Sequence, residues 1–234
     1  MRWLSGGRGL ALAGAVLLVA GPLGTRFGAW TFLVGFALLA LSALSALIGV
    51  LLSVVGGLRT REWRAAALGV MVGTLVLAVP ASQILGAGGA PPIHDITTDT
   101  VDPPAFVAAL ALRRDAANPP EYDGAEVAVQ QQRAFPDIQP IMLGASPDQA
   151  FGRVLAAAQA MGWEVVASAP TEGRLEAVDT TFWFGFKDDI VIRVRAADGG
   201  SRVDVRSKSR VGLGDAGTNA RRVRAYRAAL EAAT

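Results

Sequence analysis

The chain has 234 residues, no cysteine and a mean hydropathy of +0.38. Without cysteine it can form no disulfide and offers no thiolate to a zinc ion. Its charges are unevenly spread: the first 90 residues carry six arginines and one glutamate, whereas the remainder carries 16 basic and 19 acidic side chains. The isoelectric point near 9.5 therefore reflects the N-terminal arginines, and nucleic-acid binding is not indicated.

Three long stretches without charged side chains fill the N-terminal third of the chain. The longest, between Arg26 and Arg59, has 32 residues without Asp, Glu, Lys or Arg. About 20 apolar residues of helix cross a bilayer core, and a helix satisfies its own backbone hydrogen bonds there. We therefore predict a membrane domain over residues 1–85. Its transmembrane helices are expected at about 9–25, 29–55 and 65–85.

The first apolar segment has a competing interpretation. It is short and contains Pro22, and a cleaved signal peptide would have Arg2 and Arg8 as its charged start and Leu10–Ala20 as its apolar core. No clear small-x-small cleavage pattern precedes Arg26. Both interpretations leave the C-terminal part of the chain outside the cytoplasm.

The arginines predict the orientation of the three spans. They form one group before the first span and another between the second and the third. Positively charged residues stay on the cytoplasmic side of a membrane. The lipid bilayer is thus the first expected partner, with the N-terminus cytoplasmic and everything after the third span external. In a bacterial inner membrane, this external side is the periplasm.

Small residues in the spans predict close helix packing. Gly69 and Gly73 form a GxxxG pair, which lets two helix backbones approach closely. The three helices of one chain can use this pair, or two copies of the chain can use it to form a homo-oligomer. No ionisable side chain lies inside a predicted span, which argues against a transporter or pump.

Glycines and prolines at 86–92 predict a linker, and residues 93–234 are enough for one domain. Apolar residues alternate with charged ones along two of the expected strands, which is typical of half-buried antiparallel strands. Expected elements are a short helix near 104–114, a strand at 138–143, a helix from Ser146 to Gly162, strands at 163–169, 174–181, 189–195 and 202–206, and a helix at 218–232. The order β-α-β-β-β-β-α predicts an α+β fold, helix-grip or TBP-like, with both longer helices on one face of the sheet.

Five motifs occur in order between residues 93 and 230. They are His94–Asp99, Phe135–Ile138, Gly173–Ala177, Thr180–Asp189 and Asp204–Gly212, the last followed by Asp215, Gly217 and Asn219. On these motifs the chain resembles the bacterial family called domain of unknown function 1499. The resemblance implies a membrane-anchored envelope protein, because similar members often carry N-terminal membrane helices. It implies no activity and no catalytic residue.

Charged side chains alternate along the predicted strands and should share the sheet face opposite the helices. A solvated ladder of ion pairs is one interpretation, each pair contributing little to stability. The other is a groove for an anionic or carboxylate-bearing ligand, since guanidinium groups bind such ligands in a bidentate manner. The candidate ligand-binding residues are Arg193, Arg206, Arg210, Asp189 and Asp204.

His94 is the only histidine, and Asp95 follows it. An envelope hydrolase or transferase could use His94 as a base oriented by Asp95, and both belong to the candidate ligand-binding set. The alternative is a loop histidine with a packing role. One histidine without cysteine cannot form a typical zinc site, and no nucleotide-binding or serine-hydrolase motif is present. We therefore expect no metal and no cofactor.

Four aromatic residues crowd one strand connection and cannot all face inward from one strand. They are Phe182, Trp183, Phe184 and Phe186. Either they close one end of the core, or they contact the membrane interface or a partner protein, where such rings are favoured.

The preferred interpretation is a membrane-tethered periplasmic binding or scaffold module of the cell envelope without catalytic activity. Its expected partners, besides the bilayer, are an anionic lipid, a glycan or an envelope protein.

Overall fold

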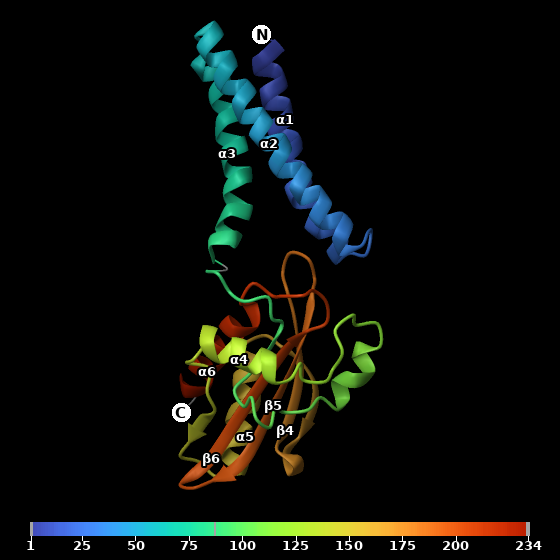
Figure 1. The fold of residues 1–234 in the computed structure, drawn as a ribbon, viewed down its shortest axis with the longest axis vertical. Helices are drawn as coiled ribbons and strands as arrows, with labels where there is room; N and C mark the ends of the chain where they lie inside the picture. Colours follow the sequence, from blue (N-terminus) through green and yellow to red (C-terminus); the bar gives the residue numbers. More distant parts are fainter. Residues whose placement is uncertain (1, 87, 233–234) are drawn as a thin grey trace. The chain divides into compact units, whose positions relative to one another are not determined.

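The computed structural model describes residues 2–86 and 88–232. The chain divides into two compact units. The first contains the three N-terminal helices together with Phe182–Gly185, and the second contains the rest of the described chain from Gly88 onward. The α+β class with three apolar N-terminal helices is confirmed (Figure 1).

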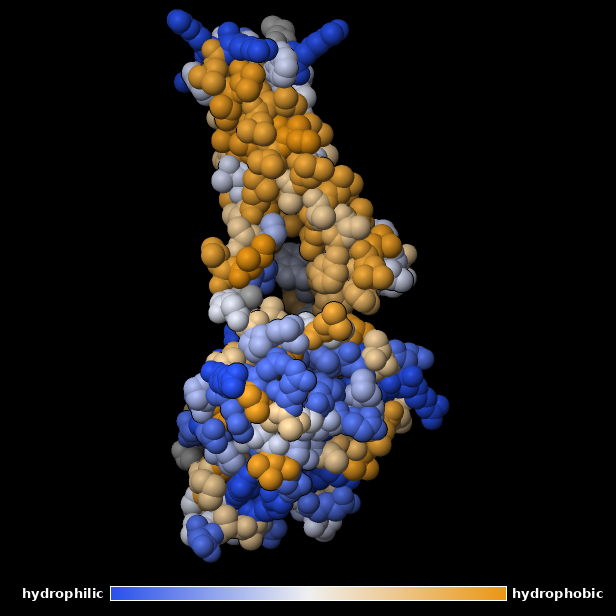
Figure 2. Space-filling view, in the orientation of Figure 1, coloured by the Kyte–Doolittle hydropathy of each residue, from blue (hydrophilic) through white to orange (hydrophobic). Residues whose placement is uncertain are grey.

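The helical unit consists of α1 (Arg2–Arg26), α2 (Phe32–Thr60) and α3 (Trp63–Gly86). All three helices are long and apolar enough to cross a membrane, and their outer surface is predominantly hydrophobic (Figure 2). Each begins or ends beyond the predicted span. Arg59 near the end of α2 lies over the ring of Trp3 in α1, 4.9 Å from its centroid, so the two arginine groups lie at the same end of the unit.

Small residues recur every seventh position where α1 and α2 pack together. The buried members are Gly7, Gly14 and Gly21 in α1 and Gly35, Ser42, Gly49 and Gly56 in α2. A Cβ atom on Gly49 would lie 2.7 Å from the backbone nitrogen of Ala11, so a larger residue would force the helices apart. Ser42 donates a hydrogen bond to the carbonyl of Gly14 at 2.7 Å. Close backbone approach and a side-chain hydrogen bond thus hold this pair, as expected in lipid.

Gly69 and Gly73 of α3 face α2 of the same chain. A Cβ atom on Gly69 would lie 2.1 Å from the hydroxyl of Ser53, and one on Gly73 would lie 2.5 Å from the side chain of Val50. Both residues of the GxxxG pair therefore take part in packing within the chain.

The second unit, here called the sheet unit, is built on an antiparallel sheet with the order β1-β6-β5-β4-β3, in which β2 also pairs with β6. Its strands are β1 (Asp95–Thr97), β2 (Ile141–Leu143), β3 (Glu164–Ala169), β4 (Arg174–Thr180), β5 (Lys187–Ala197) and β6 (Gly200–Ser209). The helical elements are the 3₁₀ helices η1 (Ala108–Arg113) and η2 (Pro170–Glu172) and the α-helices α4 (Ala125–Ala134), α5 (Pro147–Ala160) and α6 (Thr218–Ala232).

Helices α5 and α6 cover the apolar face of the sheet and complete the core. Ser146 and Gln149 form a capping box at the start of α5, where the sequence predicts that a helix begins. Trp163 stacks on Tyr226 with ring centroids 5.0 Å apart, and Tyr226 donates a hydrogen bond to the carbonyl of Val154 at 2.9 Å. The core thus fixes α6 against α5.

The sequence did not predict β1, α4 or the three-residue η2, and it predicted one further element with the wrong form. β1 is three residues long, and α4 buries only Ala128 and Gln131, so neither carries a clear apolar period. The helix expected near 104–114 is the shorter 3₁₀ helix η1. Gln131 links β1 and α4, since its amide receives a hydrogen bond from the backbone N–H of Thr97 and donates one to its carbonyl.

Candidate functional site

The charged face of the sheet is covered by residues 98–123, here called the covering segment. The first contact is at Glu176 on β4, whose buried carboxylate accepts hydrogen bonds from the backbone N–H groups of Val107, Ala108 and Ala109. These are the unpaired donors at the start of η1, so Glu176 acts as its cap from a distant strand. Phe106 and Ala109 pack on Val191 beside it.

Arg206 on β6 fixes the covering segment at a second place. Its guanidinium makes a bidentate ion pair with Asp95, at 2.9 and 2.8 Å, and donates to the carbonyls of Pro104 and Pro120. It also lies 4.8 Å from the ring centroid of Phe106. Both charged groups are buried, so Arg206 works here as a clamp between β1, β6 and the covering segment.

Asp189 on β5 is the third point of attachment. Its carboxylate pairs with Arg113 of η1 at 2.5 Å and with Arg210 at 2.7 Å. Asp189 is fully buried, and Arg113 is nearly so. Of the residues proposed from the sequence to bind a ligand, Arg206, Arg210 and Asp189 are therefore engaged by one another or by the covering segment.

His94 and Asp95 point into different surroundings. The Nε2 atom of His94 lies 3.3 Å from Asp123, and its Nδ1 atom lies 3.3 Å from the carbonyl of Leu213. The carboxylate next to the His94 ring is thus that of Asp123. Asp95, which the sequence suggested as the partner of His94, binds Arg206 and Lys208 instead.

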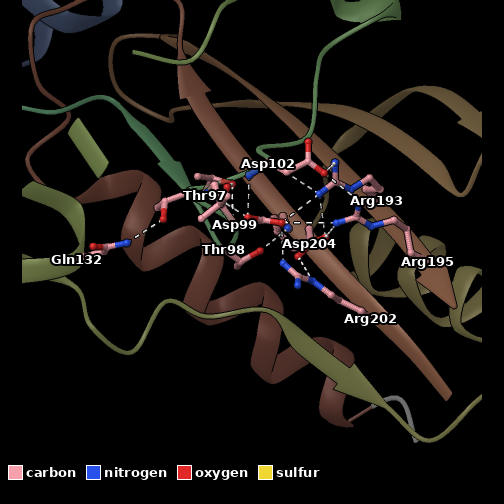
Figure 3. Close-up of polar contacts among 12 residues, drawn as sticks. Thr97, Thr98, Asp99, Asp102, Gln132, Arg193, Arg195, Arg202 and Asp204 are labelled. Carbon is pink, nitrogen blue, oxygen red and sulfur yellow. Dashed lines mark hydrogen bonds and ion pairs between the residues drawn. The ribbon is translucent and has the colours of Figure 1, made fainter. Parts of the chain in front are cut away.

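Arg193 and Asp204 are paired across β5 and β6 and belong to a cluster of charged side chains (Figure 3). Along the sheet, this cluster lies closer to the β5–β6 turn than Asp95 and Lys208 do. The cluster consists of Arg193, Arg195 and Arg202 from β5 and β6, with Asp204 from β6 and Asp99 and Asp102 from the covering segment. The buried carboxylate of Asp204 receives all three guanidinium groups, at 3.1, 3.3 and 2.8 Å respectively. Three cations and three anions make the cluster neutral, and we call it the Arg–Asp cluster.

Asp99 and Asp102 bring the covering segment into this cluster. Asp99 accepts the backbone N–H groups of Val101 and Asp102 at 3.1 and 3.0 Å, which forms a tight turn, and it pairs with Arg202 at 2.6 Å. Asp102 is exposed, and hydrogen bonding from Arg195 followed by the charge of Arg193 lowers the pKa of its carboxyl. The turn is therefore held in place by charge-assisted hydrogen bonds.

An open depression of about 410 Å³ lies beside the Arg–Asp cluster. Its lining residues are Thr98, Asp99, Thr100, Val101, Asp102, Gln132, Gln139, Pro140 and Arg202. Gln132 of α4, which is labelled in Figure 3, donates a hydrogen bond to the hydroxyl of Thr100 at 2.9 Å. The lining thus offers one guanidinium, two carboxylates, two amides and two hydroxyls.

Sequence reasoning missed most of this depression. The period of two placed Arg195 and Arg202 on the charged face but gave no reason to prefer them over other arginines. Asp99, Asp102 and Gln132 come from segments without a periodic pattern, and only the turn chemistry of Asp99 could have marked this loop.

The aromatic residues lie in the connection between β4 and β5. Phe182 and Trp183 are 73% and 48% exposed, and their rings meet edge to face with centroids 5.4 Å apart. Phe184 and Phe186 are half-buried. At least two of the four rings therefore lie outside the core.

The sequence model of the family described as "Protein of unknown function (DUF1499)" matches residues 95–230. This range begins at β1 and ends in α6, so it contains the whole sheet and the covering segment. No curated protein and no solved structure matches the chain. Because the match covers more than half of the sequence, the chain belongs to the DUF1499 family.

Proposed function

We propose that the chain is a membrane-tethered binding module of the bacterial envelope and that it performs no catalysis. Three apolar helices provide the anchor, and the arginine groups at one end of the helices favour a cytoplasmic N-terminus. The sheet unit then lies in the periplasm, where it can meet envelope components but no cytoplasmic ones.

The depression beside the Arg–Asp cluster is the observation that carries this proposal. Its volume suits a small ligand or one unit of a polymer. Its lining residues come from the covering segment, from α4 and the chain after it, and from β6. The neighbouring ion pairs hold the lining side chains in fixed positions, and such preorganisation lowers the entropy lost on binding.

The lining favours a neutral, hydroxyl-rich ligand, for which we propose a glycan. The arginines beside the depression are already paired with Asp99, Asp102 and Asp204 in the neutral Arg–Asp cluster, so no net positive charge is left to attract an anionic group. Hydroxyl groups, in contrast, can donate to carboxylates and accept from the guanidinium and the amides of Gln132 and Gln139. Arg202 remains 33% exposed and Arg195 43% exposed, so both retain donors at the surface.

Native mass spectrometry of the full chain extracted from its own membrane tests this function. We expect a carbohydrate adduct on the natural protein. The double variant Thr100→Val, Gln132→Leu should lose it, because these side chains touch the depression and hold no ion pair of the cluster. Gln159→Leu, an exposed glutamine on α5, is the matched control and should retain the adduct.

Two results would reject the glycan assignment. One is a co-purifying molecule that is not a carbohydrate and is lost in the same double variant. The other is a natural protein without an adduct that also shows no saturation transfer from envelope glycan fragments in nuclear magnetic resonance.

A further inference from the structure

At one end of the sheet, the connections between strands carry exposed apolar side chains, and the chain from α3 enters the sheet at the same end. Phe182 and Trp183 lie in the connection between β4 and β5, and Leu213, in the connection between β6 and α6, is 88% exposed. Single exposed apolar residues are ordinary, but several on adjacent connections form a surface that usually has a partner.

The strand register places these connections at the same end of the sheet. Thr180 at the end of β4 pairs with Lys187 at the start of β5, and Asp188 pairs with Ser209 at the end of β6. Asp95, the first residue of β1, pairs with Lys208. The chain coming from α3 therefore enters the sheet at the end that carries both apolar connections.

Direct hydrogen bonds join the incoming chain to the Leu213 connection. Asp215 donates its backbone N–H to the carbonyl of Ile93 at 3.2 Å, and a ring nitrogen of His94 lies 3.3 Å from the carbonyl of Leu213. The tether and this connection thus form one surface of the sheet unit.

The length of the tether limits how far this end can lie from the bilayer. Eight residues separate Gly86 at the end of α3 from Asp95. At no more than about 3.6 Å per residue, they span at most roughly 30 Å. The headgroup regions extend about 5–8 Å beyond the hydrocarbon core on each side, so the apolar end lies within easy reach of the interface.

We propose that Phe182, Trp183 and Leu213, which the strand register brings to one end of the sheet and which are here called the apolar end, insert into the lipid interface. Tryptophan and other aromatic rings are enriched at that depth of the bilayer. The exposed Lys187, adjacent to the same connection, can reach lipid phosphates. Tethering makes this second contact intramolecular, so a few side chains suffice to hold it.

This contact would orient the depression away from the membrane. Arg202, which lines the depression, lies near the start of β6, whereas Lys208 lies near its end beside the apolar end. Six residues of strand place them about 20 Å apart. The depression would then face the periplasm rather than the lipid headgroups. The insertion depends on the tether and not on the glycan site, so the two proposals can fail separately.

Single-cysteine spin labelling tests the insertion directly, because the natural chain contains no cysteine. The full chain is placed in bilayer nanodiscs of phosphatidylcholine and phosphatidylglycerol, with labels in separate variants Phe182→Cys and Leu213→Cys. Asp198→Cys, in the exposed turn at the opposite end, is the matched control. Collision with oxygen, which enters lipid, is compared with collision with a water-soluble nickel complex.

We expect oxygen to relax the labels at 182 and 213 more than nickel does, and the reverse at 198. Adding Trp183→Asp to the labelled Leu213→Cys chain should shift that label toward the nickel-accessible pattern. Labels at 182 and 213 that match the control would overturn the proposal, since the apolar end would then lie in water. Labels shielded from both reagents would also overturn it, because the partner would then be protein instead of lipid.

Discussion

Arg206 and Asp95 form a buried bidentate ion pair between β6 and β1, with nitrogen–oxygen distances of 2.9 and 2.8 Å. Lys208 adds a second cation 3.1 Å from the same carboxylate. Burying these charges costs free energy, which is repaid only while every partner is present. The covered face of the sheet therefore depends on Asp95.

Asp95→Asn should destabilise the sheet unit by about 3–5 kcal/mol, because it leaves two buried cations facing a neutral amide. This is a large part of the 5–15 kcal/mol typical of a folded domain. Asp137→Asn is the control. It removes an ion pair of similar length to Arg224, at 2.6 Å, in which both side chains are about half exposed, and such pairs contribute about 0–1 kcal/mol.

Urea-dependent pulse proteolysis of the full chain in micelles measures both effects on the sheet unit. Equal midpoints for the two variants would show that the Asp95 pair contributes no more than a surface pair. The covered face would then not depend on it.

Val203→Asp should unfold the sheet unit. Val203 lies in the core opposite Val194, with no exposed surface. A carboxylate there has no partner, and its burial costs several kcal/mol. Met142→Asp places the same group one residue away in the neighbouring strand, on a side chain that is 60% exposed and opposite Arg202.

The same proteolysis assay separates these two variants. We expect Val203→Asp to be digested without urea and Met142→Asp to resist like the natural chain. Protection of Val203→Asp at the natural urea midpoint would contradict the assignment of strand faces.

Elements with a strong local pattern were predictable from the sequence. The capping residues of α5 and the alternation along β5 and β6 each reflect a local physical requirement, which a single sequence displays. Val203 is an example: it alternates with the charged residues of the predicted strand at 202–206, which places it on the face that the helices cover, and the structure has it there.

The covering segment shows why the rest could not be predicted. Its attachment uses backbone donors of Val107–Ala109 and single side chains such as Arg113, whose partners are 67 to 76 positions away in the sequence. No periodicity reports such contacts, so Glu176 and Asp189 were indistinguishable from solvated strand residues. The same reason hid Asp99 and Asp102 of the Arg–Asp cluster.

The orientation in the membrane can be tested with reporter fusions at the C-terminus. Alkaline phosphatase folds to an active enzyme only outside the cytoplasm, so we expect activity when it follows the last residue. The physical reason is that both arginine groups lie at one end of the helices, where Arg59 contacts Trp3, and positively charged residues stay on the cytoplasmic side of a membrane. A fusion of green fluorescent protein at the same point is the control and should be dark. A stable but inactive phosphatase fusion with a fluorescent counterpart would reverse the assigned topology.

The two tyrosines of the chain predict an unusual alkaline titration. Burial, and then the nearby charge of Asp95, raises the pKa of Tyr122 to about 12, and burial also raises that of Tyr226. In the unfolded chain both pKa values are about 10. The unfolded state therefore loses protons first, so these groups contribute stability that is fully present below pH 10 and is lost as the pH rises toward 12.

Absorbance at 295 nm should consequently show almost no tyrosinate in the folded protein at pH 10, followed by a single step when the sheet unit unfolds at higher pH.

Two Phe substitutions separate the tyrosines. Tyr226→Phe removes the hydrogen bond to Val154 and should cost about 1 kcal/mol. Tyr122→Phe should cost nothing or stabilise, because the buried hydroxyl of Tyr122 has no hydrogen-bond partner among residues 2–86 and 88–232. Each variant should halve the 295 nm step. A half-amplitude titration near pH 10 in the natural chain, with the sheet unit still folded, would show that one tyrosine is open to solvent and that the packing described around it is wrong.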